Sequence, residues 1–321
     1  MRNKIFGILA IASVMVACSN DETISIVSSE PITFGNTFVE NSTRAVMDNT
    51  YGGGIYSLTK FNVYGTVTSN DGTVNIYNGD EVTGTIGSSI WSCEKVQYWV
   101  PNCIYNFMAL VDATESENSV TVDQATGMPT SITYDVTSQK DLLIAKANRE
   151  QKDKELDDSE VAFTFSHLLS KVQFTFTNHF PENSDVKLKV KELKITNAPQ
   201  TGTYTIGSDN NNSWTMGTVT GEINFGNSEE ISPAGTGTSE YAKVLIPGTN
   251  TFNISFTVAH NKGGEPTPKS FTTGAITLES GKSYNFTADL NAQNVSGVAP
   301  ITFKITEDDD WTGGEDKNVD Y

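Results

Sequence analysis

Apolar side chains recur at every second residue over long stretches of this chain, and this period limits the possible folds more than any other feature. Successive side chains of a β-strand point to opposite faces, so a period of two gives one buried and one solvated face. No long window has the helical period. The pattern predicts an all-β protein of sandwich type, and its clearest positions are Val161, Phe163, Phe165, Val172, Phe174 and Phe176.

The length of 321 residues suits one large domain or two of ordinary size. Between two strand-rich halves lies the mixed-charge run "DLLIAKANREQKDKELDDSE" at 141–160, which we interpret as an exposed connection, with a surface helix as the alternative. We therefore expect an N-terminal β-sandwich domain at 45–158 and a C-terminal one at 159–321. Asp-Gly at 71–72 and Asn-Gly at 78–79 predict hairpin turns.

The charge balance excludes some classes of function. The chain carries 39 acidic and 21 basic residues, a formal net charge of −18, whereas a nucleic-acid partner requires clustered Lys and Arg. The histidines at 167, 179 and 260 lack zinc-type spacing, and there is no nucleophile elbow or phosphate loop. We expect no enzymatic activity, no cofactor and no metal site, and we interpret His167, in a strand-like run, as structural.

The N-terminal stretch "MRNKIFGILAIASVMVACSN" predicts export. A basic start precedes an apolar run at 5–17, which is too short to span a bilayer but fits a signal peptide. Small residues followed by Cys18 favour a bacterial lipoprotein signal, with residues 1–17 removed and Cys18 acylated, palmitate included. The lipid would hold the chain at the outer membrane. An ordinary secretory signal with an incidental cysteine is the alternative.

The other two cysteines are Cys93 and Cys103, and a disulfide is permitted in an exported protein. We interpret "WSCEKVQYWVPNCIYNF" as a hairpin that turns at 100–102. In such a hairpin Cys93 lies about six residues from the position opposite Cys103, beyond bonding range. Two separate buried thiols are therefore favoured over a disulfide.

Several stretches together resemble the fimbrillin family, the subunits of type V pili of Gram-negative anaerobes. None is specific alone, but they follow one another in the order of the family over nearly the whole chain. Besides the lipoprotein signal, the final strand and Trp311, they are "ITF" at 32–34, "STRA" at 42–45, "YWVP" at 98–101, "YNFMAL" at 105–110, "DLLIA" at 141–145, "FTFSHLLSKVQFTF" at 163–176, "LKITNAPQTGTYTI" at 193–206, "VLIPGTN" at 244–250 and "SGKSYNFTADL" at 280–290.

The resemblance implies two transthyretin-like β-sandwich domains and a life cycle with two steps. An arginine-specific or trypsin-like protease would cut between Arg44 and Ala45, which removes the lipidated propeptide, 18–44, and its first strand. A strand of another subunit would then fill the vacated groove. The implied displaced strand carries Ile32, Phe34 and Phe38, and the implied donor strand carries Ile301, Phe303 and Ile305.

The implied partners are other pilus subunits, the maturation protease and a host or bacterial adhesion target. A stalk or a tip subunit fits these features, and the "STRA" site argues against an anchor. The alternative is a surface lipoprotein that binds glycan or host protein without polymerising. Its binding platform would be Trp91, Tyr98, Trp99 and Trp214, although such aromatic residues more often belong to the core.

The residues themselves support strand exchange through one short repeat. The tetrapeptide "PITF" occurs at 31–34 and again at 300–303. A donor strand must repeat the side-chain pattern of the strand it replaces, so exchange would require this similarity. A chance likeness of two short strands is the alternative.

Overall fold

The computed structural model describes residues 30–39, 45–48, 54–84, 91–114, 118–151, 160–207, 211–263 and 265–308. The predictions for Cys18, Arg44 and the acidic stretch around Trp311 lie outside these residues. The described chain is almost entirely β-strand, with one short helix, α1 (Ala292–Val295), and 3-10 turns at Val136–Ser138 and Glu182–Ser184. The all-β prediction is confirmed. No helix in these ranges is long and apolar enough to cross a membrane.

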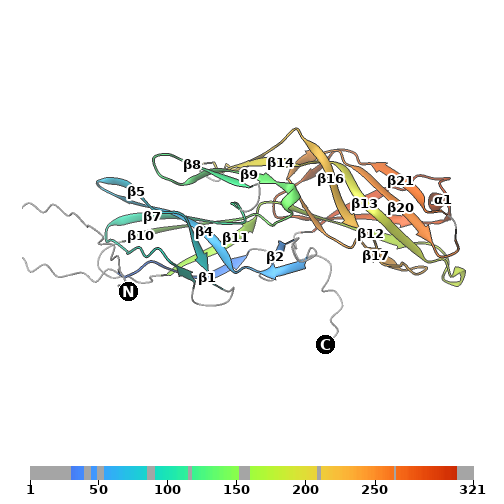
Figure 1. Cartoon of the computed structure of the whole chain (residues 1–321), viewed down its shortest axis with the longest axis horizontal. Coiled ribbons are helices and arrows are strands. Elements are labelled where there is room, and N and C mark those ends of the chain that lie inside the picture. Colours follow the sequence, from blue (N-terminus) through green and yellow to red (C-terminus); the bar gives the residue numbers. More distant parts are fainter. Residues whose placement is uncertain are drawn as a thin grey trace, which may run out of the picture.

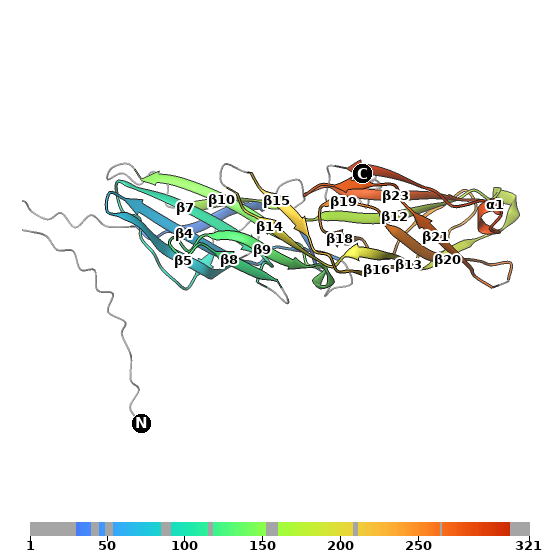
Figure 2. The same cartoon turned by 90° about the horizontal axis from the view of Figure 1, so that it is seen from above.

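The molecule is elongated, and its two strand-rich halves follow one another along the long axis (Figures 1 and 2). A seven-stranded sheet occupies one half, in the order β1-β11-β10-β7-β4-β5-β6. Its strands are β1 (Thr33–Val39), β4 (Lys60–Ser69), β5 (Gly72–Thr83), β6 (Ser92–Cys93), β7 (Cys103–Val111), β10 (Leu143–Gln151) and β11 (Glu160–His167).

A four-stranded sheet, in the order β15-β14-β9-β8, packs against this first sheet. Its strands are β8 (Ser119–Val122), β9 (Pro129–Asp135), β14 (Thr201–Thr205) and β15 (Ser213–Met216). Ile132 and Tyr134 of β9 belong to the same buried cluster as Met108 and Leu110 of β7. Strands β11 and β14 follow residue 158 but pair with strands that precede it, and the division of the chain at 158 stays a prediction.

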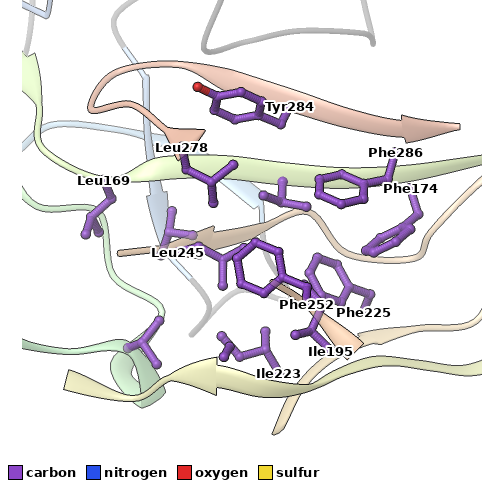
Figure 3. Close-up of a cluster of buried hydrophobic side chains, with 14 of the residues drawn as sticks. Leu169, Phe174, Ile195, Ile223, Phe225, Leu245, Phe252, Leu278, Tyr284 and Phe286 are labelled. Carbon is purple, nitrogen blue, oxygen red and sulfur yellow. The ribbon is translucent and has the colours of Figure 1, made fainter. Parts of the chain in front are cut away.

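The other half of the molecule is a sandwich of two sheets. The five-stranded sheet runs β17-β12-β23-β24 with β18 also on β12, and the four-stranded sheet runs β16-β13-β20-β21. Phenylalanines from both sheets meet between them, as Phe174, Phe225 and Phe286 do in Figure 3. The strands are β12 (Ser170–Asn178), β13 (Leu188–Pro199), β16 (Thr220–Gly226), β17 (Thr236–Thr238), β18 (Lys243–Leu245), β20 (Asn253–His260), β21 (Thr267–Thr272), β23 (Ser283–Leu290) and β24 (Phe303–Asp308).

Two small two-stranded sheets complete the fold. One pairs β19 (Gly248–Asn250) with β22 (Ile276–Leu278), and the other pairs β2 (Ala45–Asp48) with β3 (Gly54–Ser57). The alternating pattern has the predicted consequence in the large sheets. In β11, Val161, Phe163 and Phe165 are buried, whereas Ala162 and Thr164 between them are exposed.

Three local predictions need correction. Residues 143–151 are no connection or helix but strand β10, which pairs with β7 along its whole length. Asp71-Gly72 does turn the chain between β4 and β5, but Asn78-Gly79 lies within β5 as a bulge, with Gly79 at φ 79°. The residues before Cys103 form no hairpin with β7, since residues 97–99 bond to residues 30–32 instead.

Candidate functional site

Strand β1 lies between two partners that are distant in sequence. It pairs in parallel with β11, where Thr33 faces Glu160 and Phe34 faces Val161. On its other side the Ile32 amide donates to the Gln97 carbonyl at 2.8 Å. The amides of Trp99 and Trp91 donate to the carbonyls of residues 30 and 34, at 3.0 and 3.3 Å. The N-terminal strand therefore closes the curved seven-stranded sheet against the segment 91–99.

The inward side of β1 fills an aromatic core. Ile32 and Phe34 are 6% and 1% exposed. The Phe34 ring stacks on Phe163 at 6.0 Å between centroids and meets Tyr77 edge-on at 5.6 Å. Burial raises the pKa of the Tyr77 hydroxyl further above neutral pH. Removal of β1 would expose these rings to water, together with Phe61 and Phe107.

The pairing of β1 with β11 is irregular in its middle. Gly35 faces Ala162, and the next pair is Phe38 with Thr164. Between these two pairs β1 therefore has one residue more than β11. This is a β-bulge, in which the extra residue is unpaired and the ladder is interrupted. Gly35 lies directly under the Glu160 side chain, and a Cβ at position 35 would collide with the Glu160 carboxyl.

The predicted site residues near the cleavage position are only partly described. Phe38 lies in β1 by its backbone, but its side chain lies outside the described residues, as does Arg44. Ala45 is the first residue of β2 and pairs with Ser57 of β3. The Arg44–Ala45 bond therefore lies between the end of β1, at Val39, and the start of β2.

The predicted donor residues lie in the other half of the molecule. Strand β24 is an edge strand, and it pairs with β23 without a register shift, Phe303 opposite Ala288 and Ile305 opposite Phe286. Ile301 is buried at 4% exposure, and the half-buried Phe303 ring lies 5.4 Å from Phe271 and 5.6 Å from Phe174. The two "PITF" segments thus lead into strands of separate sheets, β1 and β24.

Arg149 is the one arginine after the predicted cleavage position. It lies in β10, paired with Tyr105 of β7, and its guanidinium sits 5.1 Å from the centre of the Trp99 ring. A protease needs an unpaired, extended segment, and strand pairing denies it one. Strand pairing therefore protects the chain at Arg149 from cleavage.

The cysteines and His167 have structural surroundings. Cys93 and Cys103 are free, as predicted, although Cys93 is half-buried rather than buried. Burial raises the pKa of both thiols, which lowers their reactivity. His167 is buried, and its Nδ1 lies 2.7 Å from Oδ2 of the buried Asp141.

The proposed aromatic platform does not form as a surface. Trp91 and Trp99 are 4% and 1% exposed, and both lie against the groove of β1. Trp214 is half-buried, and its Nε1 donates to the Leu168 carbonyl at 2.9 Å. Of these residues only Tyr98 is well exposed. The reading of these residues as a joint binding surface is therefore wrong.

Sequence reasoning missed the partners that hold β1 in place. The roles of Glu160, Gly35 and the segment 91–99 follow from pairings between residues more than fifty positions apart. No local pattern marks such a pairing. Besides the family resemblance, the recurrence of "PITF" was the signal in the sequence that pointed to this groove.

Comparison with known proteins gives the class of protein that these features define. The chain matches the fimbrillin-like family over residues 43–307. Its fold is similar to that of a fimbrial protein from Bacteroides vulgatus, with a TM-score of 0.58 and 16% identity over 86% of this chain and 98% of that one. It is also similar to a cell adhesion protein from Bacteroides uniformis, with a TM-score of 0.52 and 19% identity over 88% and 99% of the two chains. No curated protein matches the chain.

The chain belongs to the fimbrillin-like family. It is accordingly a structural protein of fimbrial type and not an enzyme. Proteins of this family are components of cell-surface appendages and associate with other pilus subunits.

Proposed function

We propose that this protein is a stalk or tip subunit of a pilus that is exported as a lipoprotein through Cys18. Cleavage after Arg44 frees it from the membrane and removes β1. A C-terminal strand of a neighbouring subunit, carrying Ile301, Phe303 and Ile305, then enters the groove. The chain thus assembles with its own kind or with related subunits and supports adhesion.

One observation carries the proposal: β1 and the segment leading into β24 share both a sequence and a burial pattern. In "PITF" at 31–34 the residues are exposed, buried, exposed and buried, and at 300–303 they are exposed, buried, exposed and half-buried. An entering strand with this pattern would place an isoleucine and a phenylalanine where β1 places its own. Recognition of this kind uses main-chain hydrogen bonds for affinity and alternate side chains for specificity.

The energetics explain why cleavage would come first. Burial of Ile32 and Phe34 contributes about 1.5–3 kcal/mol each, and each backbone hydrogen bond adds about 0.5–1.5 kcal/mol. While β1 is covalently attached, its effective concentration at the groove exceeds that of any strand from another molecule. Cleavage at Arg44 removes this advantage, and loss of β1 leaves an unpaired sheet edge that another strand can join.

The test is limited digestion of the lipid-free chain with an arginine-specific protease. We expect a new N-terminus at Ala45 and, on an unboiled gel, a ladder of multimers that heat dissociates. The Arg44→Ala variant should stay monomeric, whereas the Arg149→Lys variant should be cut and polymerise like the unmodified chain. A stable monomer after cleavage at Arg44 would contradict the proposal. A ladder of multimers formed by the uncut Arg44→Ala variant would contradict it as well.

A further inference from the structure

The two "PITF" segments align the donor with the groove residue by residue. With residues 300–303 in the place of 31–34, Lys304 takes the position of Gly35 and Ile305 that of Asn36. Thr302 takes the position of Thr33, opposite Glu160. A slip of one residue would turn Ile301 and Phe303 away from the core, so burial specifies this register strongly.

Beyond the tetrapeptide the two strands differ, and the difference favours the donor. The resident strand has a bulge after Gly35, where Asn36 interrupts the apolar alternation. Strand β24 is regular throughout, and Ile305 continues the alternation of Ile301 and Phe303. A regular strand in this register places Ile305 opposite Phe163, which is fully buried in β11. The donor therefore offers one more apolar side chain to the groove at the level of the bulge.

The charges at this level also fit. The Glu160 carboxyl lies over Gly35 and would have to move aside for any side chain at that position. It is the end of a flexible side chain, half-buried at the start of β11. The donor brings Lys304, which is exposed and has no ion-pair partner within the described part of its own chain. A lysine on the same face as Glu160 and diagonal to it lies within reach of its carboxylate.

We propose that the donor strand binds parallel to β11 with residues 300–303 in the place of 31–34, continues without a bulge, and pairs its Lys304 with Glu160 of the acceptor subunit. This register rests on the proposed function. It explains a feature that exchange alone leaves open, namely that the resident strand carries a glycine and a bulge. The glycine and the bulge weaken the pairing of β1 with β11, whereas the regular donor strand fills the groove along its whole length.

The first test of this register is a cross-link between two variants in which alanine replaces the free Cys93 and Cys103, so that each cleaved subunit carries one introduced cysteine. A Thr302→Cys subunit and a Glu160→Cys subunit are cleaved, mixed and oxidised, and a disulfide dimer is read on a non-reducing gel. The matched control replaces Glu160→Cys by Val161→Cys, because position 161 faces the opposite side of β11. We expect the dimer with position 160 and none with position 161. Polymers that form with the reverse result, or with neither cross-link, would overturn the register and leave the proposed function intact.

The second test reverses the two charges. Lys304→Glu or Glu160→Lys alone should slow polymerisation of the cleaved subunit about fivefold, the effect of losing roughly 1 kcal/mol from an ion pair. The chain with both reversals should regain the original rate, since each donor again meets an opposite charge. Equal rates for all variants would overturn the ion pair. If even the unmodified cleaved chain forms no polymer, the proposed function fails, and this inference fails with it.

Discussion

At the scale of single residues, the pair of His167 and Asp141 anchors the strand on which β1 rests. His167 is the last residue of β11 and pairs in register with Leu143 of β10. Its side chain and that of Asp141 are 2% and 0% exposed, and their nearest polar atoms lie 2.7 Å apart. A polar group so deeply buried is tolerated only while its partner remains. The strand-like surroundings predicted a structural role for this histidine, but its partner could not be read from the sequence.

We expect His167→Leu to lower the free energy of unfolding by about 3–5 kcal/mol, since it leaves the Asp141 carboxylate buried without its partner. Urea unfolding followed by tryptophan fluorescence measures this loss. The matched control is His179→Leu, which removes a similar contact, His179 Nε2 to Asp289 Oδ1 at 2.9 Å, between two exposed side chains. That variant should lose less than about 1 kcal/mol. Equal losses in the two variants would contradict a special role for the buried pair.

At the scale of elements, alternation revealed most strands but not all of them. Strand β10 escaped because Lys146, Asn148 and Glu150 occupy its exposed side, so its outward face reads as a charged connection. The Asn-Gly bulge in β5 escaped because the same dipeptide also makes hairpin turns, and only pairing with β4 distinguishes the two. The groove could not be predicted from local patterns, because β1 pairs with β11 and with residues 91–99, which are distant from it in sequence. The sequence predicts which face of a strand is buried, whereas the strands that pair with it depend on the whole fold.

We expect Phe34→Ala in the uncut chain to lower the free energy of unfolding by about 3–5 kcal/mol, the usual cost of truncating a buried phenylalanine. The same change should speed hydrogen exchange at the amides of β11, because β1 then holds the sheet edge less firmly. Thr33→Ala, on the exposed side of the same strand, should cost less than about 1 kcal/mol. A Phe34→Ala chain with unchanged exchange in β11 would mean that the groove stays closed without the aromatic contact of β1.

At the scale of the whole molecule, the proposed donor and acceptor lie in different halves of an elongated body (Figure 1). In one chain β1 fills the groove on β11 while β24 pairs with β23. Exchange between molecules would join the C-terminal half of one to the N-terminal half of the next. Such a head-to-tail contact uses two different surfaces, and repetition of it builds an open filament rather than a closed pair.

This geometry gives a prediction that separates strand entry from other modes of assembly. A synthetic peptide of residues 300–308, "PITFKITED", should bind the cleaved subunit and stop the ladder at the monomer, because it fills the groove without carrying an acceptor of its own. A control peptide with asparagine in place of Ile301, Phe303 and Ile305 keeps the length and charge but loses the apolar side chains, so it should leave the ladder unchanged.

The uncut chain supplies the remaining control, since β1 occupies its groove at high effective concentration. It should bind neither peptide, as measured by fluorescence anisotropy of a labelled copy. If both peptides stopped the ladder equally, the groove would not distinguish apolar from polar side chains. Binding of the first peptide to the uncut chain would show that it binds outside the groove, and would contradict the link between loss of β1 and assembly.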